Sequence, residues 1–144
     1  MIKTARVPRE TQQLKRIRDW MRRFLAPLDV SEQEQSLLIV AIDEICANAI
    51  LHGAPSANED TPDVLELRLE FEPPVLKVEI TDPGRPFDYD DYHAQSVREI
   101  KESGRRGGLG LKLVERIMDR VTFGEIDGHN VCRLEKKLSV SAAG

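Results

Sequence analysis

The chain has 144 residues, of which 40% are hydrophobic and 32% charged, as expected for one folded domain with its own core. Its nine glycines and eight prolines exclude a collagen-like or low-complexity chain, and no apolar run is long enough to span a membrane. Two cysteines, Cys46 and Cys132, are too few for a disulfide scaffold or a Cys-rich zinc site. The polar N-terminus does not resemble a signal peptide, so we expect a cytoplasmic protein.

The net charge of −4 is distributed unevenly along the chain. Residues 1–25 carry a net charge of +6, and the remaining residues carry −10. The basic residues of the first segment are Lys3, Arg6, Arg9, Lys15, Arg16, Arg18, Arg22 and Arg23. Two interpretations stay open, a solvated helix face or a surface that docks a partner.

The first half of the chain predicts a strand and two helices. Lys3–Val7 alternates like a short strand that ends at Pro8, and Thr11–Leu25 carries apolar residues at helical spacing. Ser31 and Glu34 have the spacing of a capping box at the start of a second helix, which runs to Gly53. That helix is apolar on most sides, so we expect it to be largely buried.

The second half predicts two hairpins around one more helix. Val64–Phe71 and Val75–Thr81 alternate with period two. After a long polar segment, interpreted as a lid, a glycine-rich run opens a helix over Leu111–Arg120. The last two predicted strands are Val121–Ile126 and Val131–Leu138, with Asp-Gly in a loop longer than two residues.

This order of elements predicts an α+β fold. Helices grouped with antiparallel strands indicate a two-layer sandwich, in which a mixed, mostly antiparallel sheet is covered on one face by helices. The other face of the sheet is then either solvated or used for assembly.

The second helix carries a stripe of polar residues that needs an explanation. Glu44, Asn48 and His52 recur at four-residue spacing and share one side of the helix. Burial of an unpaired carboxylate is costly, so this side is expected to line a wet cleft. There the Asn48 amide oxygen suits Mg²⁺ and Glu44 suits proton transfer. The alternative is an i,i+4 pair on the surface, with His52 as a capping or packing residue.

Two glycine-containing segments follow. Asp82-Pro83-Gly84 suits recognition of an amine on a flat ring, because Gly permits close approach, although the same residues favour a plain turn. The run from Gly107 to Gly110 frees backbone N–H groups for phosphate at a helix start, beside Arg105 and Arg106; the alternative is a flexible helix entry. Together with the polar helix stripe, these segments indicate a nucleotide site.

At this point the chain resembles a known superfamily. Asp43–Gly53 (DEICANAILHG) looks like the N-box of the GHKL ATPases, which include gyrase, MutL and the histidine kinases. Its Asn-Ala-x-x-His-Gly run resembles the anti-sigma factor serine/threonine kinases of the RsbW and SpoIIAB type. Asp82–Asp88 (DPGRPFD) looks like the adenine-binding box, Gly108–Leu111 (GLGL) like the second glycine box and Val131–Leu134 (VCRL) like the closing strand.

The resemblance implies roles for particular residues. By position Asn48 would ligate Mg²⁺, and Glu44 would be the general base. Asp82 would accept a hydrogen bond from the adenine amine, with Gly84 beside the ring. The other residues implied in the ATP site are Arg105, Arg106, Gly108, Leu109, Gly110 and Leu111. The chain departs from its relatives in two places. Pro86 replaces a second glycine, and Gly128-His129-Asn130 replaces a Gly-Thr pair, which leaves Asn130 as the candidate substitute for the threonine.

The resemblance also implies a fold and a function. Residues 1–144 would form one Bergerat ATP-binding sandwich that uses ATP and Mg²⁺ to phosphorylate a serine or threonine of a STAS-domain anti-sigma factor antagonist. Such proteins also sequester a sigma factor in a partner-switching pathway of transcription regulation, and they commonly work as homodimers. Their N-terminal strand and first helix lie away from the nucleotide, so the basic segment is a candidate docking or dimer surface.

Three other functions stay open at this stage. The first is a non-catalytic ATP-binding module that binds a partner in a nucleotide-dependent way. The second is a histidine-kinase catalytic domain, which would need a phosphoacceptor histidine on a dimerisation helix that these residues do not contain. The third is DNA binding by the basic helix, which no nucleic-acid motif supports and which the acidic remainder disfavours, so we expect no direct DNA contact.

Overall fold

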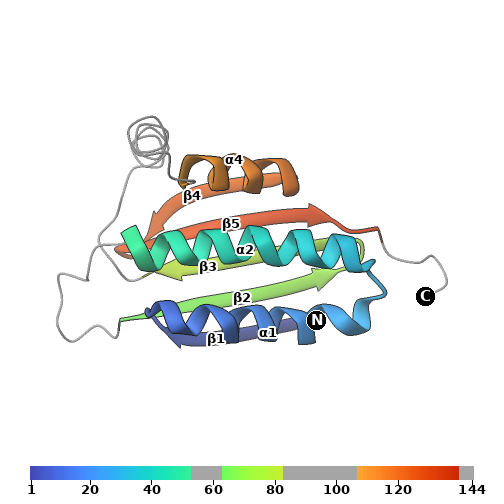
Figure 1. Ribbon diagram of the computed structural model, residues 1–144, viewed down its shortest axis with the longest axis horizontal. Coiled ribbons are helices and arrows are strands. Elements are labelled where there is room, and N and C mark those ends of the chain that lie inside the picture. The colour runs from blue at the N-terminus through green and yellow to red at the C-terminus, as the bar shows by residue number, and fades with distance from the viewer. Residues whose placement is uncertain (53–62, 83–106, 140–144) are drawn as a thin grey trace.

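The computed structural model describes residues 1–52, 63–82 and 107–139, and these form a sheet with helices on one face (Figure 1). The strands are β1 (Ile2–Pro8), β2 (Val64–Glu72), β3 (Val75–Asp82), β4 (Arg120–Ile126) and β5 (His129–Lys137), in the spatial order β1-β2-β3-β5-β4. The α-helices are α1 (Leu14–Leu25), α2 (Glu32–His52) and α4 (Gly107–Ile117), and short 3₁₀ turns cover Thr11–Gln13 and Ala26–Leu28. The predicted α+β sandwich is confirmed.

Every pairing between the described strands is antiparallel. The register places Asp82, the last residue of β3, opposite Asn130 in β5. It also places Pro8, the last residue of β1, opposite Val64, the first residue of β2. The ends of these four strands therefore lie side by side and form one edge of the sheet, perpendicular to the strand direction. The C-terminal end of α2 lies over this edge (Figure 1).

The two faces of the sheet differ sharply in polarity. Leu65, Leu67 and Leu69 of β2 point into the core, while Glu66 and Arg68 between them are exposed. The alternation continues in β3, and on the outer face Arg133 forms an ion pair with Glu79 at 3.0 Å. A charged face keeps its interactions with water, so the described part of the outer face fits the solvated interpretation.

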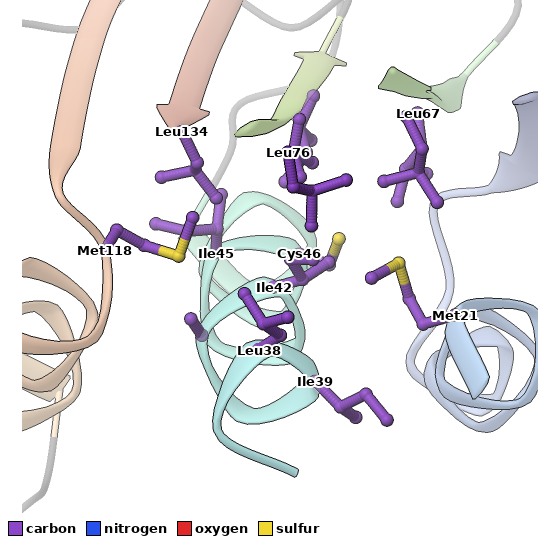
Figure 2. Packing of buried hydrophobic residues seen from close by; sticks show 14 of the residues in the cluster. Met21, Leu38, Ile39, Ile42, Ile45, Cys46, Leu67, Leu76, Met118 and Leu134 are labelled. Atoms are coloured by element: carbon purple, nitrogen blue, oxygen red, sulfur yellow. The ribbon is translucent and has the colours of Figure 1, made fainter. Parts of the chain in front are cut away.

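Helix α2 is the centre of the core. Its residues Leu38, Ile42 and Cys46 are fully buried against the sheet, and α1 and α4 lie on its two sides (Figure 2). Leu38, Ile42 and Cys46 follow one another at four-residue spacing, so they form one stripe. Val40 lies on the opposite, outward side and is 44% exposed, and Leu37 on a flank of the helix is 40% exposed. The prediction of a largely buried helix is confirmed.

The capping box at the start of α2 is half formed. The Ser31 hydroxyl accepts a hydrogen bond from the Glu34 backbone N–H at 3.1 Å, as predicted. The Glu34 carboxylate, however, accepts from the Ser139 backbone N–H at 3.3 Å and does not return to Ser31. The Glu34 side chain thus links Ser139, two residues after the end of β5, to the start of α2.

The main differences from the predicted element boundaries lie at the β4–β5 loop and at α4, which ends at Ile117 instead of Arg120. The loop between β4 and β5 has only two residues, Asp127 and Gly128, and the prediction of a longer loop was wrong. Both residues have positive φ (52° and 81°), which is the geometry of a type I′ turn and matches the twist of the strands. Helix α4 begins at Gly107, so the glycines form its first turn instead of preceding it.

Both cysteines are buried in the core as free thiols. Burial raises the pKa of Cys46, with a further contribution from the nearby charge of Asp43, and burial raises the pKa of Cys132 to about 12. Both therefore stay protonated at neutral pH and act as small apolar residues. Among the residues that the structure describes, no helix is long and apolar enough to cross a membrane.

The core position of α2 predicts unequal effects of two neighbouring truncations. Ile42→Ala should lower the free energy of unfolding by about 2–5 kcal/mol, because it leaves a cavity between α2 and the sheet. Val40→Ala, at a position 44% exposed, should cost well under about 1 kcal/mol. Urea unfolding of both variants measures the difference, and equal losses would contradict the packing described here.

Candidate functional site

Glu44 and Asn48 lie one turn apart on α2, and their side chains meet. The Asn48 Nδ2 donates a hydrogen bond to Glu44 Oε1 at 3.4 Å. Asn48 is only 9% exposed and Glu44 is half-buried, so this i,i+4 pair does not lie on the open surface. The structure therefore combines the two interpretations of the stripe: the residues do pair, but they pair in a sheltered place.

The first turn of α4 closes over Glu44. A side-chain carbon added at Gly110 would collide with the carboxyl carbon and Oε1 of Glu44. Any residue larger than glycine would therefore push α4 away from α2 or displace the carboxylate. The N-terminal end of a helix carries a partial positive charge, which stabilises an ionised Glu44 at this place.

Asn48 has the chemistry expected of a Mg²⁺ ligand. Its amide nitrogen is directed at Glu44, so its amide oxygen is the atom that can coordinate a hard cation. Over residues 1–52, 63–82 and 107–139, no three His, Cys, Asp or Glu side chains are grouped as metal ligands. The Asn48 amide oxygen thus offers a hard cation one ligand from α2.

Asp82 is a buried carboxylate at the end of β3, with 3% of its surface exposed. Its neighbour across the ladder is Asn130, which is 6% exposed. These two residues therefore place a carboxylate and an amide side by side at the edge of the sheet. This is the position that the sequence predicts for Asp82, and it makes Asn130 the neighbour of the same site.

Arg9 also reaches this place, although the sequence singled it out only as one of eight basic residues. Its side chain is 5% exposed, and its Nη1 lies 3.6 Å from Asp82 Oδ1. The same nitrogen donates to the backbone carbonyl of Ala49 at 3.5 Å. Antiparallel pairing with β2 carries the end of β1 to this edge, and so places Arg9, which follows β1, beside Asp82.

The remaining predicted site residues fall into two groups. Gly108 and Leu109 belong to the first turn of α4, and the side chain of Leu111 is fully buried in the core. Gly84, Arg105 and Arg106 lie outside the described residues, as does the predicted lid. The structure thus brings together Glu44, Asn48 and the start of α4. Arg9 connects them to Asp82, because it contacts both Asp82 and the carbonyl oxygen of Ala49, the residue after Asn48 in α2.

The contact between α4 and Glu44 gives a prediction about stability. Alanine normally stabilises a helix over glycine by about 1 kcal/mol, but Gly110→Ala should gain less than this, because the added carbon would displace the Glu44 carboxylate. Gly124→Ala in β4 is a control without a collision, since nothing lies within 4 Å of its added carbon. Thermal unfolding measures both variants, and a gain of the full amount at Gly110 would contradict the close approach.

Comparison with known proteins identifies similar sequences. The family described as "Histidine kinase-like ATPase domain" matches residues 7–136. The serine-protein kinase RsbW of Staphylococcus aureus strains RF122 and MRSA252 is 31% identical over 87 residues, which is 58% of this chain. That alignment covers 54% of the relatives' own length, so the chain spans about half of the curated relatives it matches.

Two solved bacterial structures have a similar fold. The structure of the RsbU and RsbW domains of Rv1364c from Mycobacterium tuberculosis matches 99% of this chain and 34% of that chain, at 16% identity and a TM-score of 0.68. The SiaB–SiaC complex from Pseudomonas aeruginosa matches 95% of this chain and 89% of that chain, at 16% identity and a TM-score of 0.58. The fold, the matched sequence and the order of the boxes agree, and the chain belongs to the histidine kinase-like ATPase family.

Proposed function

We propose that this protein is an ATP-dependent serine/threonine protein kinase of the anti-sigma factor type. It would phosphorylate a serine or threonine of a STAS-domain antagonist and sequester a sigma factor. The observation that carries this proposal is the Glu44–Asn48 pair, which α2 holds against the first turn of α4. A kinase needs a base for the incoming hydroxyl and a cation ligand near the phosphates, and this pair offers both.

The nucleotide would lie along the edge where the strands end. Asp82 accepts a hydrogen bond from the adenine amine in this proposal, and the start of α4 offers its N–H groups to the phosphates. Arg105 and Arg106, just upstream of α4 in the sequence, would add positive charge there. The order of these parts along the edge gives base recognition near β3 and phosphate recognition near α4.

The chemistry assigned to the chain is positioning and proton transfer. Mg²⁺ on the Asn48 oxygen would neutralise charge on the phosphates. Glu44 takes the proton from the incoming serine or threonine hydroxyl. Its carboxylate is held from two sides, by the Asn48 amide at 3.4 Å and by the close backbone of Gly110. A base fixed in this way loses little conformational freedom when the hydroxyl arrives.

The protein partners are inferred from the relatives and from the charge of α1. The similar curated proteins are named serine-protein kinases, and one similar structure is a complex of two different proteins. Several basic residues near α1 already have internal partners, since Arg18 pairs with Asp43 at 2.8 Å and Arg22 with Asp19 at 3.0 Å. The exposed Lys15, Arg16 and Arg23 remain the best candidates for contacts with an acidic partner or a second copy of the chain.

Loss of the proposed base should stop transfer but leave ATP binding intact. Glu44→Ala should lower the rate of phosphoryl transfer by about 10²–10⁴-fold. The measurement is transfer of radiolabel from ATP to a STAS-domain protein that co-purifies with the chain. Glu32→Ala, an exposed acid in the first turn of the same helix, is the control and should keep the parent rate.

Two results would contradict this assignment in different ways. Full transfer by Glu44→Ala would remove Glu44 from the base role. Nucleotide-dependent capture of the partner without any label transfer, even by the parent protein, would favour the non-catalytic binding module instead.

Loss of the proposed cation ligand should change how ATP affinity depends on Mg²⁺. Asn48→Ala should weaken Mg²⁺-ATP binding by at least about tenfold, because it removes an oxygen ligand of the ion. When Mg²⁺ is removed with a chelator, the variant and the parent protein should bind ATP with similar affinity. Asn48→Asp keeps an oxygen at the same place and should retain most of the Mg²⁺ dependence. An unchanged Mg²⁺-ATP titration for Asn48→Ala would count against the assignment.

A further inference from the structure

Arg9 is the most buried basic side chain for which the structure gives an ion pair. It follows the last residue of β1, and only 5% of its side chain is exposed. The other ion-paired arginines have 35% to 62% of their side chains exposed. Burial of a charged side chain is unfavourable unless its partners compensate, so the contacts of Arg9 need an explanation.

The guanidinium of Arg9 joins three parts of the chain. Its Nε pairs with Asp63 Oδ1 at 2.8 Å, just before β2 begins. Its Nη1 lies 3.6 Å from Asp82 Oδ1 at the end of β3 and 3.5 Å from the carbonyl oxygen of Ala49 in α2. The backbone N–H of Arg9 also donates to the Asp63 carbonyl at 3.1 Å, which fixes the start of the side chain. Arg9 is thus held from both ends in one position.

The contact with Asp82 has a chemical consequence. A positive charge close to a carboxylate favours its ionised form, whereas burial alone favours the neutral acid. An ionised carboxylate only accepts hydrogen bonds, while the neutral acid carries a donor as well. The charge on Arg9 therefore favours the form of the buried Asp82 that only accepts hydrogen bonds from a ligand.

We propose that Arg9 is a positioning residue that sets base specificity by holding Asp82 ionised and in one orientation, so that the site selects a base with an exocyclic amine. This inference rests on the proposed function, in which Asp82 recognises the adenine amine. A carboxylate offers two oxygens with about four acceptor positions, so a contact of Oδ1 with Arg9 is compatible with acceptance from an amine. Arg9 itself need not touch the nucleotide.

The test compares two ligands that differ only in the amine. ADP and purine riboside 5′-diphosphate are titrated calorimetrically, in the presence of Mg²⁺, into the full chain and its variants. The ratio of the two dissociation constants is the amine preference. Diphosphates avoid turnover, so the readout does not depend on kinase activity. If Arg9 had a purely structural role, its substitution would weaken the binding of both ligands alike and leave the ratio of their dissociation constants unchanged.

Arg9→Gln should lower the amine preference by about tenfold, the size expected when a hydrogen bond to a charged group is lost. Binding of the ligand without the amine should change by less than about twofold, since Arg9 acts on the amine contact alone. The control is Arg6→Gln in the adjoining strand β1, whose ion pair with Glu66 at 3.1 Å is exposed. This control should leave both constants unchanged, and an unchanged preference in Arg9→Gln would overturn the proposal.

Two further variants keep the test decisive. If Arg9→Gln does not fold, Arg9→Lys takes its place. It keeps the charge but lacks the second nitrogen for Asp63, so the preference should fall by about threefold, and no fall would overturn the proposal. In an Asp82→Asn background, Arg9→Gln should cause no further loss of preference. A further loss there would show that Arg9 does not act through Asp82 and would overturn the proposal.

The same titrations separate this inference from the proposed function. If the unsubstituted protein binds neither ligand, both the proposed function and the inference about Arg9 are wrong. If it prefers ADP and Asp82→Asn removes that preference while the Arg9 variants keep it, base recognition by Asp82 stands and only the role of Arg9 falls.

Discussion

The packing of α2 on the sheet is the constraint on which the rest of the structure depends. Leu38, Ile42 and Cys46 fill the space above the central strands, and α1 and α4 both pack against the same helix (Figure 2). Once that stripe faces the sheet, the geometry of an α-helix leaves Glu44 and Asn48 on a flank that faces α4. Helix α2 therefore contributes to the core and also positions the Glu44–Asn48 pair. Substitutions that disturb its packing are expected to displace the pair.

The second feature with a large energetic consequence is the buried charge at the end of β3. A carboxylate that is 3% exposed is stable only with compensating charge or hydrogen bonds, and Arg9 provides the charge from the end of β1. Apolar residues could occupy such a position at lower cost, as substitutions of buried ion pairs in other proteins show. The presence of a carboxylate at this buried position therefore fits a role in binding. The contact of Arg9 with Asp82 links that role to the end of the N-terminal strand.

Charge on the rest of the basic segment has a more ordinary use. Arg6, Arg18 and Arg22 each form an ion pair within the chain; the pairs of Arg6 and Arg22 are exposed and that of Arg18 is half-buried. Exposed pairs contribute little to stability, because water screens them. The solvated-face interpretation therefore accounts for part of the N-terminal charge. A docking surface on α1 would depend on the residues for which the structure gives no such pair, and the exposed examples are Lys15, Arg16 and Arg23.

Sequence by itself determined the local structure and the identity of most candidate residues. Periodicity placed the helices and strands, because the alternation of apolar residues reports which side of an element is buried, and the boxes pointed to Glu44, Asn48 and Asp82. Tertiary structure alone decided which distant residues meet. The close approach of Gly110 to the Glu44 side chain arises from the packing of α4 on α2, and the Arg9–Asp82 contact arises because β2 pairs with both β1 and β3. Neither contact leaves a local pattern, because residues distant in sequence meet only once the strand order and helix packing are set.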